Sequence, residues 1–247
     1  MMDSWRAMQR ACGLVDRPEH RSVVALLSSL DAALLRDAGC WFGGGTAISL
    51  RCGEYRLSRD VDFLCASREG YRALRERVFD AGLRGLFVRE VGIPREARVD
   101  RYGIRGVVEV DGTPLKLEIV SEGRIALVGI SDPDLPVARL SDEDLVAEKI
   151  LANADRFLDD SSLGRDALDL VVLAHQLGEL PASAWEKARD AYGDSVDRAY
   201  ARALQRMRDR PELLQRALET LDVRPEAREI IGARLARIDP TPQTGSE

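Results

Sequence analysis

The sequence predicts an α+β fold in which a small mixed sheet is preceded by a helical segment and followed by a helical domain. Three observations support this prediction. A leading stretch, residues 21–37, has helical character and ends before Gly39. Short strands separated by turns and helices then fill residues 40–140. From Ser141 onward, capping residues and apolar residues three or four positions apart indicate helices alone.

The predicted organisation divides the 247 residues into four parts. Residues 1–39 form an N-terminal helical segment, and residues 40–140 form the sheet core. Residues 141–238 form the helical domain, and residues 239–247, rich in Pro, Thr and Gly, form a flexible tail. A chain of this length can bury one large core or two modest ones.

The core begins with a strand at residues 40–42, a glycine turn and a short helix that starts near Thr46. Glycines 43–45 leave backbone N–H groups free at the helix start, where an anionic phosphate is favoured. A lone Gly-Gly-Thr stretch is usually an ordinary turn. It indicates a phosphate site only together with the acidic strand that follows.

The second strand carries Asp60 and Asp62 on one face, because side chains at i and i+2 of a strand point the same way. Two carboxylates that close repel each other unless a cation lies between them. Hard divalent metals such as Mg²⁺ prefer oxygen ligands and usually bring substrate phosphates with them. The glycine turn and the acidic pair together indicate a site for Mg²⁺ and a nucleotide.

A helix at residues 68–81 and further strands complete the predicted core. Residues 111–112 are Asp-Gly, which is a strong hairpin signal. In the returning strand, Leu117 and Ile119 alternate with polar residues, so Glu118 lies on the face opposite the apolar side chains. Glu118 is either a third acid of the site or an exposed surface residue.

The helical domain is predicted to begin with a helix capped by Ser141. Apolar residues follow helical spacing along residues 145–158, and Lys149 and Arg156 share a neighbouring stripe. Residues 183–186 (Ser-Ala-Trp-Glu) have the spacing of a capping box, which predicts the start of a later helix.

Two stretches of the core resemble the nucleotidyltransferases of the AbiEii/AbiGii toxin family, a branch of the DNA polymerase β-like superfamily. One is GGT-A-x-x-L at residues 44–50, and the other is R-x-S-x-D-x-D-F at residues 56–63. Each stretch alone is weak, but the two at this spacing are specific. The resemblance implies that the sheet core is a nucleotidyltransferase core.

The resemblance continues in the helical domain. Residues 145–152 match L-x-x-x-K-x-x-A, and residues 165–169 match the family's basic residue, Asp, two spacers and Asp. The sequence departs from the family pattern at three points. Glu118 replaces a common Asp, Arg165 replaces a frequent Lys, and an Arg expected a few residues earlier is absent, with Ser161 and Ser162 in that region. Without the resemblance, Arg165 and Asp169 have the four-residue spacing of an ordinary surface ion pair.

The resemblance implies an enzyme that uses Mg²⁺ or Mn²⁺ to move a nucleotide from an NTP to an acceptor. It implies that Asp60, Asp62 and Glu118 hold the metal ions, and that Lys149 and Asp166 complete the catalytic set. Two metal ions in this role stabilise the attacking and leaving oxygens of an in-line displacement. The residues that it implies for nucleotide binding are Gly44, Gly45, Thr46, Arg56, Ser58 and Lys149.

The acceptor that the resemblance favours is RNA, at a tRNA 3′ end. The enzyme would then be the toxin of a toxin–antitoxin or phage-defence system, with a cognate antitoxin as its partner. Transfer to a protein hydroxyl or a small molecule is one alternative, and a catalytically silent interaction module is another. The acids Asp60, Asp62 and Glu118, together with Lys149, argue against the silent module.

Charge does not decide between these acceptors. A net charge of −6 and a pI near 5.2 oppose strong nonspecific binding to RNA. Residues 198–210 are locally basic, so Arg198, Arg202 and Arg206 either contact RNA or form a solvated helix face.

Lysine is scarce in this chain, since only three of the 36 basic residues are lysines. Lys116 and Lys149 are two of these three, and both fall within the stretches described above. A compact ammonium that approaches a triphosphate cannot simply be replaced by a planar guanidinium. The scarcity therefore favours a specific role for Lys149.

The sequence predicts a cytoplasmic protein with no membrane partner. No apolar run reaches the length of a membrane span, and the first residues lack the apolar core of a signal peptide. The four cysteines show no C-x-x-C spacing and the chain has only two histidines, so a zinc site is not expected. Free thiols are typical of a reducing compartment.

Overall fold

The computed structural model describes residues 15–238, so the predicted tail at 239–247 lies outside the described residues. The helices are α2 (Pro18–Ser29), α3 (Ala32–Asp37), α4 (Gly44–Arg51), α5 (Arg68–Ala81), α6 (Asp142–Arg156), α7 (Arg165–Leu177), α8 (Ala182–Tyr192), α9 (Ser195–Asp209), α10 (Pro211–Thr220) and α11 (Pro225–Ala236). The strands are β1 (Cys40–Gly43), β2 (Val61–Cys65), β3 (Arg98–Val99), β4 (Gly103–Val110), β5 (Thr113–Ser121), β6 (Gly129–Ile130) and β7 (Arg139–Leu140).

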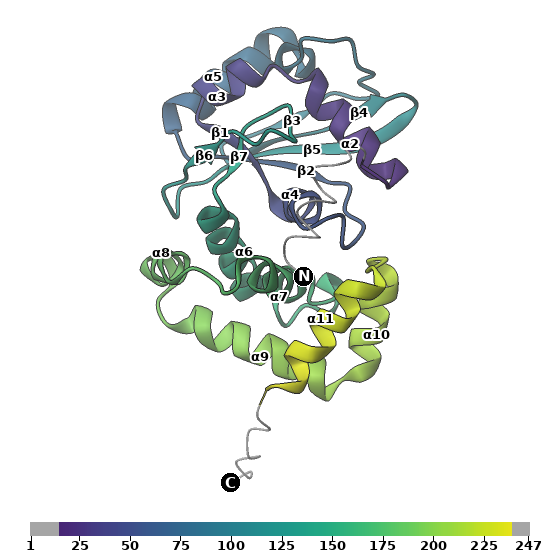
Figure 1. The fold of residues 1–247 in the computed structure, drawn as a ribbon. Coiled ribbons are helices and arrows are strands. Elements are labelled where there is room, and N and C mark those ends of the chain that lie inside the picture. The colour runs from purple at the N-terminus through teal and green to yellow at the C-terminus, as the bar shows by residue number, and fades with distance from the viewer. Residues whose placement is uncertain (1–14, 239–247) are drawn as a thin grey trace.

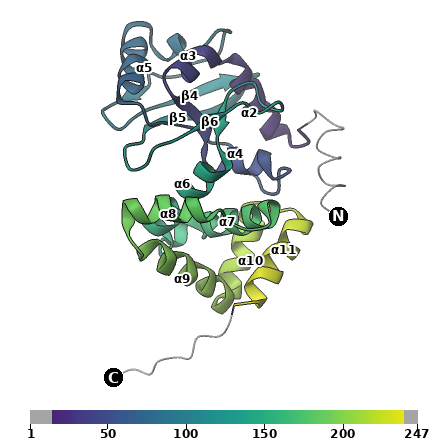
Figure 2. The same cartoon turned by 60° about the vertical axis from the view of Figure 1, so that its left-hand side comes forward.

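The arrangement of these elements confirms the predicted α+β class. One sheet is covered on one side by α2, α3 and α5, while α4 lies on its other side (Figure 1). The helices from α6 to α11 form a second lobe on the α4 side of the sheet, in both views of the molecule (Figures 1 and 2). The acidic strand β2 therefore belongs to the sheet layer, and α4 lies between that layer and the helical lobe.

The sheet is mixed, as predicted, with the strand order β3-β4-β5-β2-β1-β7-β6. β2 pairs in parallel with β5, and β1 pairs in parallel with β7, whereas the remaining neighbours are antiparallel. The predicted hairpin joins β4 to β5, where Asp111 and Gly112 have φ of +49° and +75°. The parallel pairing sets Asp62 directly beside Glu118.

The leading helical stretch predicted at residues 21–37 consists of two helices in the structure. α2 ends at Ser29, and α3 begins after Asp31. The carboxylate of Asp31 accepts the backbone N–H of Leu34 at 3.0 Å and so caps α3. One aspartate in a favourable N-cap position is enough to start a new helix.

The helical lobe confirms one predicted cap and contradicts another. The Ser141 hydroxyl accepts the backbone N–H of Asp144 at 3.1 Å at the start of α6. By contrast, α8 follows Pro181, and Ser183 lies inside its first turn and donates its hydroxyl to the Glu143 carboxylate at 2.6 Å. Within residues 15–238, no helix combines the length and the apolar character needed to cross a bilayer.

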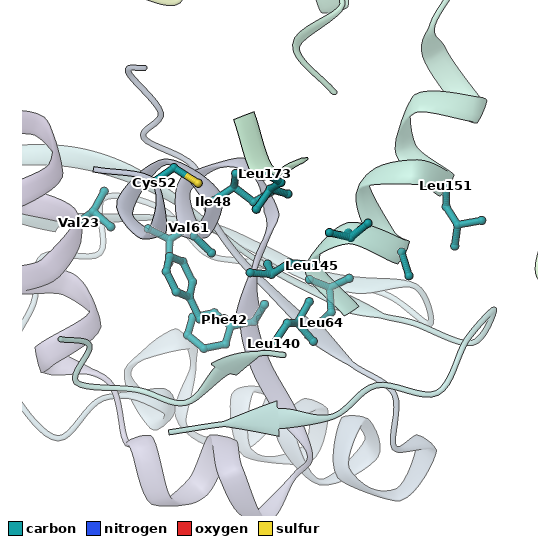
Figure 3. Packing of buried hydrophobic residues seen from close by; sticks show 14 of the residues in the cluster. Val23, Phe42, Ile48, Cys52, Val61, Leu64, Leu140, Leu145, Leu151 and Leu173 are labelled. Atoms are coloured by element: carbon teal, nitrogen blue, oxygen red, sulfur yellow. The ribbon is translucent and has the colours of Figure 1, made fainter. Parts of the chain in front are cut away.

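One continuous core joins the sheet to the helical lobe. Figure 3 shows Phe42 and Val61 from the sheet packed close to Ile48 of α4, Leu140 of β7 and Leu145 of α6. These side chains are almost fully buried, and each contributes about 1.5–3 kcal/mol to the stability of the fold. The two lobes are therefore fixed to each other, and a site between them rests on a common scaffold.

Candidate active site

A cleft of about 450 Å³ lies where the sheet meets the helical lobe. Its walls come from residues 56–60, from β2, β5, α6 and α7, and from the end of α10. The residues singled out from the sequence that line this cleft are Gly45, Arg56, Ser58, Asp60, Asp62, Glu118 and Lys149. A larger hollow of about 590 Å³ lies beside the β4–β5 turn, but none of those residues lines it. The smaller cleft is the candidate active site.

The two glycines that begin α4, Gly44 and Gly45, pack against two residues of this cleft. Gly44 has φ of +68°, and a Cβ there would collide with the Asp62 carboxylate. A Cβ at Gly45 would collide with the Arg56 guanidinium. Gly43 precedes α4 and offers no side-chain cap, so the first N–H groups of the helix are left to other partners. This turn can bind a phosphate next to Asp62.

Asp60 and Asp62 both line the cleft. β2 begins at Val61, so Asp60 immediately precedes the strand that was predicted to carry both acids. Asp60 is exposed, and its Oδ1 lies 4.0 Å from the Lys116 ammonium nitrogen. Burial, with the nearby carboxylates of Asp60 and Glu118, raises the pKa of Asp62 to about 6. A cation among these acids would relieve the repulsion between them, because an opposite charge favours the ionised form.

Glu118 lies beside Asp62, but its carboxylate is bonded to Arg105. Arg105 is its cross-strand neighbour on β4, and the distance from Arg105 Nε to Glu118 Oε1 is 2.6 Å. Among residues 15–238, no three acidic, His or Cys side chains are grouped closely enough to hold a metal ion as they stand. All three predicted donors are carboxylates, which suits a hard divalent metal, and Glu118 would have to leave Arg105 to join it.

Lys149 is buried between two acids of α7. Its Nζ lies 2.9 Å from Asp166 Oδ1 and 3.0 Å from Asp169 Oδ2. The Arg156 guanidinium also holds the Asp166 carboxylate, through Nε at 2.5 Å and Nη2 at 2.9 Å. Burial alone would raise the pKa of Asp166, but Lys149 and Arg156 hold it well below its usual range. The Lys149 ammonium is therefore charged and fixed in position.

Arg56 forms a buried ion pair that connects the two lobes. Its Nε and Nη2 donate to the two oxygens of Asp169 at 2.8 and 3.0 Å, and both side chains are almost fully buried. The surface pair of Arg165 with Asp169, considered from the sequence, does not form. Arg56 therefore anchors the segment before the acidic strand, and its guanidinium is already occupied by a carboxylate.

Thr46 is fully buried and holds the same segment from the other end. Its hydroxyl donates to the backbone carbonyl of Asp60 at 2.5 Å. Because that donation uses the one hydroxyl hydrogen of Thr46, the 2.8 Å contact with Ser58 Oγ requires Ser58 to donate. A phosphate bound at this turn would therefore be contacted by the backbone N–H groups of Gly44 and Gly45 and not by the Thr46 hydroxyl.

Two arginines line the cleft without forming an ion pair in the described part of the chain. Arg59 immediately precedes Asp60, and Arg165 begins α7. Within the described part of the chain, no carboxylate lies within ion-pair distance of either guanidinium. Cations that line a concave, low-dielectric surface attract polyanionic ligands.

The arginines singled out from residues 198–210 lie on α9 and do not line the cleft. Arg206 pairs with Asp160 and donates to the Phe157 carbonyl at 2.9 Å. The Arg202 guanidinium carbon lies 5.2 Å from the centre of the Phe157 ring. Arg198 and Arg202 are exposed at the surface of α9.

Sequence reasoning gave no catalytic or binding role to three residues that the structure brings to this site. Asp169 lies one helical turn after Asp166, and this spacing was the signal that could have placed both acids on one face of α7. Arg156 was on the Lys149 stripe, but its contact with Asp166 could not be read from the spacing. Arg59 carried no distinguishing pattern.

Comparison with known protein families gives an extensive match. The family model described as "Nucleotidyl transferase AbiEii toxin, Type IV TA system" matches residues 25–244. No curated protein sequence matches the chain. An antigenic nucleotidyltransferase-like protein from Paracoccidioides brasiliensis is 17% identical, with a TM-score of 0.47, over 80% of this chain and 92% of that chain. MenT4, a nucleotidyltransferase toxin from Mycobacterium tuberculosis, is 19% identical, with a TM-score of 0.33, over 95% of this chain and 99% of that chain.

Proposed function

The chain belongs to the AbiEii family of nucleotidyltransferase toxins, and from that premise we propose that it transfers a nucleotide from an NTP to a tRNA 3′ end. One observation carries the proposal. Asp60, Asp62 and the glycine turn line the same cleft as the buried Lys149. An acidic pair beside a phosphate-binding turn and a fixed ammonium is the set that nucleotidyl transfer requires.

The NTP would bind with its triphosphate at the start of α4. The backbone N–H groups of Gly44 and Gly45 would donate to the outer phosphates, where the helix dipole favours negative charge. Lys149 would neutralise charge on the leaving pyrophosphate. Asp166 would keep the Lys149 ammonium in place, because their 2.9 Å contact fixes its position.

Asp60, Asp62 and Glu118 would hold Mg²⁺ or Mn²⁺. Bound there, such ions would supply charge neutralisation at the attacking and leaving oxygens. The carboxylates themselves would accept the proton of the acceptor hydroxyl. As that oxygen bonds to the α-phosphorus, the bond from the α-phosphorus to the pyrophosphate oxygen breaks. Lys149 and Arg156 favour the ionised form of Asp62 that this role needs.

RNA is the acceptor that the open cations of the cleft favour. Arg59 lies on the sheet side and Arg165 on the helical side, so a polyanionic chain could contact both. Arg198 and Arg202 of α9 would extend these contacts to phosphates farther from the reacting end. A protein hydroxyl or a small molecule would not need this spread of cations. An antitoxin that restrains this activity, in toxin–antitoxin function or phage defence, completes the proposal.

The proposal is tested by incubating the purified protein with each labelled NTP, total RNA and Mg²⁺. We expect label in the tRNA fraction with at least one NTP, loss of labelling when EDTA is added, and loss of labelling in Asp60→Ala. Label that enters protein or a small molecule, but no RNA, would replace the acceptor. Labelling of RNA by Asp60→Ala at the wild-type rate would remove the acidic pair from the mechanism.

A further inference from the structure

The geometry points to His20 as a positioning residue for the acidic pair. Its buried imidazole links the Glu54 carboxylate to the backbone of Ser58, two residues before Asp60, and so fixes the segment 56–60 at the edge of the cleft. The role in turnover rests on the proposed function, whereas the link itself is a property of the fold.

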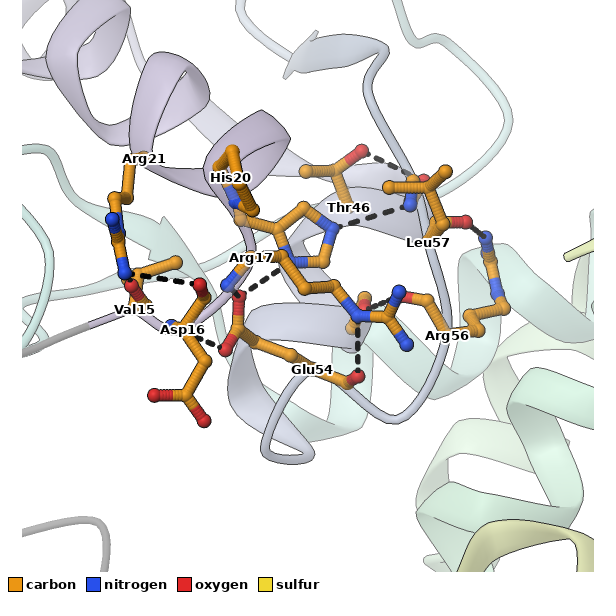
Figure 4. A network of polar contacts seen from close by, with 12 residues as sticks. Val15, Asp16, Arg17, His20, Arg21, Thr46, Glu54, Arg56 and Leu57 are labelled. Carbon is orange, nitrogen blue, oxygen red and sulfur yellow. Dashed lines mark hydrogen bonds and ion pairs between the residues drawn. The ribbon is translucent and has the colours of Figure 1, made fainter. Parts of the chain in front are cut away.

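The imidazole makes two hydrogen bonds. His20 lies on α2 and is fully buried. Its Nδ1 is 2.8 Å from Glu54 Oε1, and its Nε2 is 3.2 Å from the backbone nitrogen of Ser58. Figure 4 shows the ring between Glu54 and the backbone that follows Leu57. Both ring nitrogens are therefore occupied.

These partners determine the protonation state of the ring. A backbone N–H can only donate, so Nε2 must carry a lone pair that accepts from Ser58. The single ring proton must then sit on Nδ1 and be donated to Glu54. A second proton, on Nε2, would place two hydrogen-bond donors opposite each other, the ring N–H and the backbone N–H of Ser58, and the hydrogen bond would be lost. Burial lowers the pKa of His20 despite the neighbouring Glu54, which agrees with a neutral ring.

Glu54 is held as firmly as the ring that it binds. Its carboxylate accepts the backbone N–H groups of Asp16 and Arg17 at 2.7 and 3.1 Å, and Arg224 lies 3.2 Å away. The Glu54 backbone has φ of +56°, in a region that residues other than glycine rarely adopt. Strain of this kind persists only where the surroundings over-determine it, and it is concentrated at functional sites.

The segment 56–60 is held at several points, and His20 supplies one near its middle. Asp169 holds the Arg56 side chain, and Thr46 holds the Asp60 carbonyl. The backbone N–H of Leu57 also donates to the Leu221 carbonyl at 2.8 Å. Without the imidazole, the N–H of Ser58 would lose its partner, and the segment would be held less firmly, so that the Asp60 carboxylate could shift relative to that of Asp62.

Two substitutions separate this link from simple packing. His20→Gln retains an amide oxygen near the position of Nε2, which can accept from Ser58. His20→Asn is shorter and retains a polar group only near Nδ1, facing Glu54. Both variants lose the ring and its packing. His175→Gln, on the exposed part of α7, is the control for loss of a histidine.

We expect kcat of His20→Gln to stay within about threefold of wild type, while His20→Asn falls at least about tenfold below His20→Gln. KM for the NTP should be the same in both, because the glycine turn is unchanged. If kcat falls equally in the two variants and in proportion to their loss of thermal stability, His20 supports only the fold and the inference fails.

Two readouts do not depend on transferase activity. In full-length wild type labelled with ¹⁵N, the His20 ring should show the Nδ1-protonated neutral tautomer at pH 7.5, assigned by comparison with His175→Gln. Hydrogen exchange of the Ser58 amide should be faster in His20→Asn than in His20→Gln. An Nε2-protonated ring, or equal exchange in both variants, overturns the inference. If these two results hold and wild type transfers no nucleotide, the proposed function fails while the link stands.

Discussion

The pKa of about 6 at Asp62 makes the stability of the protein depend on pH. The value for an unfolded chain is 3.8, so folding favours the protonated carboxyl group. The stability that Asp62 contributes is therefore fully present below pH 3.8 and is lost as the pH rises through about 6. At neutral pH without divalent metal, the ionised side chain opposes folding.

Asp62→Asn tests this balance, because it removes the charge and keeps the shape of the side chain. We expect the variant to be more stable than wild type at pH 8 in EDTA by about 1–2 kcal/mol, allowing for solvent screening of the shift. The advantage should shrink at pH 5. Urea denaturation at both pH values measures it, and nucleotide transfer should be abolished. A variant less stable than wild type at pH 8 would show that the ionised Asp62 carboxylate does not destabilise the folded protein.

Lys149 is the second residue whose surroundings make a definite prediction. In Lys149→Arg the charge remains, but a planar guanidinium must fit between Asp166 and Asp169, with Arg56 already bound to Asp169. We expect a fall of roughly 100-fold in the single-turnover rate at saturating NTP.

The control for that variant is Lys187→Arg. Lys187 also pairs with two acids, Glu143 and Asp144, but it does not line the cleft. The Lys187→Arg variant should retain the wild-type single-turnover rate. If Lys149→Arg were as active as wild type, the compact ammonium would have no special role, and the scarcity of lysine would no longer support a specific role for Lys149.

At the level of elements, the Asp169 carboxylate links α7 to the segment that precedes the acidic strand. Asp169 receives Arg56 from the segment before β2 and Lys149 from α6. Asp169→Asn should destabilise the protein by about 3–5 kcal/mol, because it leaves two buried cations short of a partner. The free energy of unfolding in urea measures this loss. The exposed Asp190→Asn of α8 should change it little, and equal losses in the two variants would contradict the role of Asp169.

The elements that carry the site could be predicted where the signal was local. The glycine turn, the i,i+2 spacing of Asp60 and Asp62 and the Asp-Gly hairpin each depend on a few adjacent residues, and α5 begins and ends at the predicted residues. Contacts between distant segments could not be predicted in this way. The Arg56–Asp169 pair spans 113 positions and the His20–Glu54 pair spans 34.

Errors at helix starts have the same physical origin. Ser183 and Glu186 have the spacing of a capping box, yet Pro181 fixes the start of α8 earlier, and the Ser183 hydroxyl finds a partner on α6. Local spacing shows which hydrogen bonds a serine is able to form. Its actual hydrogen bond depends on which groups the tertiary structure brings near.

For the whole molecule, the cleft lies between lobes that share one core, and each lobe contributes an open cation. If RNA bridges Arg59 and Arg165, replacing both by Ala should weaken RNA binding and reduce the slope of log K against log salt by about two. Filter binding of tRNA at several salt concentrations measures the slope. Binding of NTP at the glycine turn should change much less.

The matched control replaces Arg72 and Arg75 of α5, two exposed arginines on the side of the sheet away from the helical lobe (Figure 1). It removes the same formal charge from a distant face. An equal change of slope in both double variants would show that RNA responds to net charge alone. An unchanged slope in Arg59→Ala/Arg165→Ala would remove the cleft arginines from acceptor binding.

The contacts of Leu57 with Leu221 and of Glu54 with Arg224 have a consequence for how the protein is made. Synthesis proceeds from the N-terminus, and domains begin to fold while the chain is still growing. A nascent chain would contain Asp60, Asp62 and Glu118 long before the ribosome has added Leu221 and Arg224. The acidic segment would acquire its final position only near the end of translation, so the proposed nucleotide transfer would begin only when synthesis is almost complete.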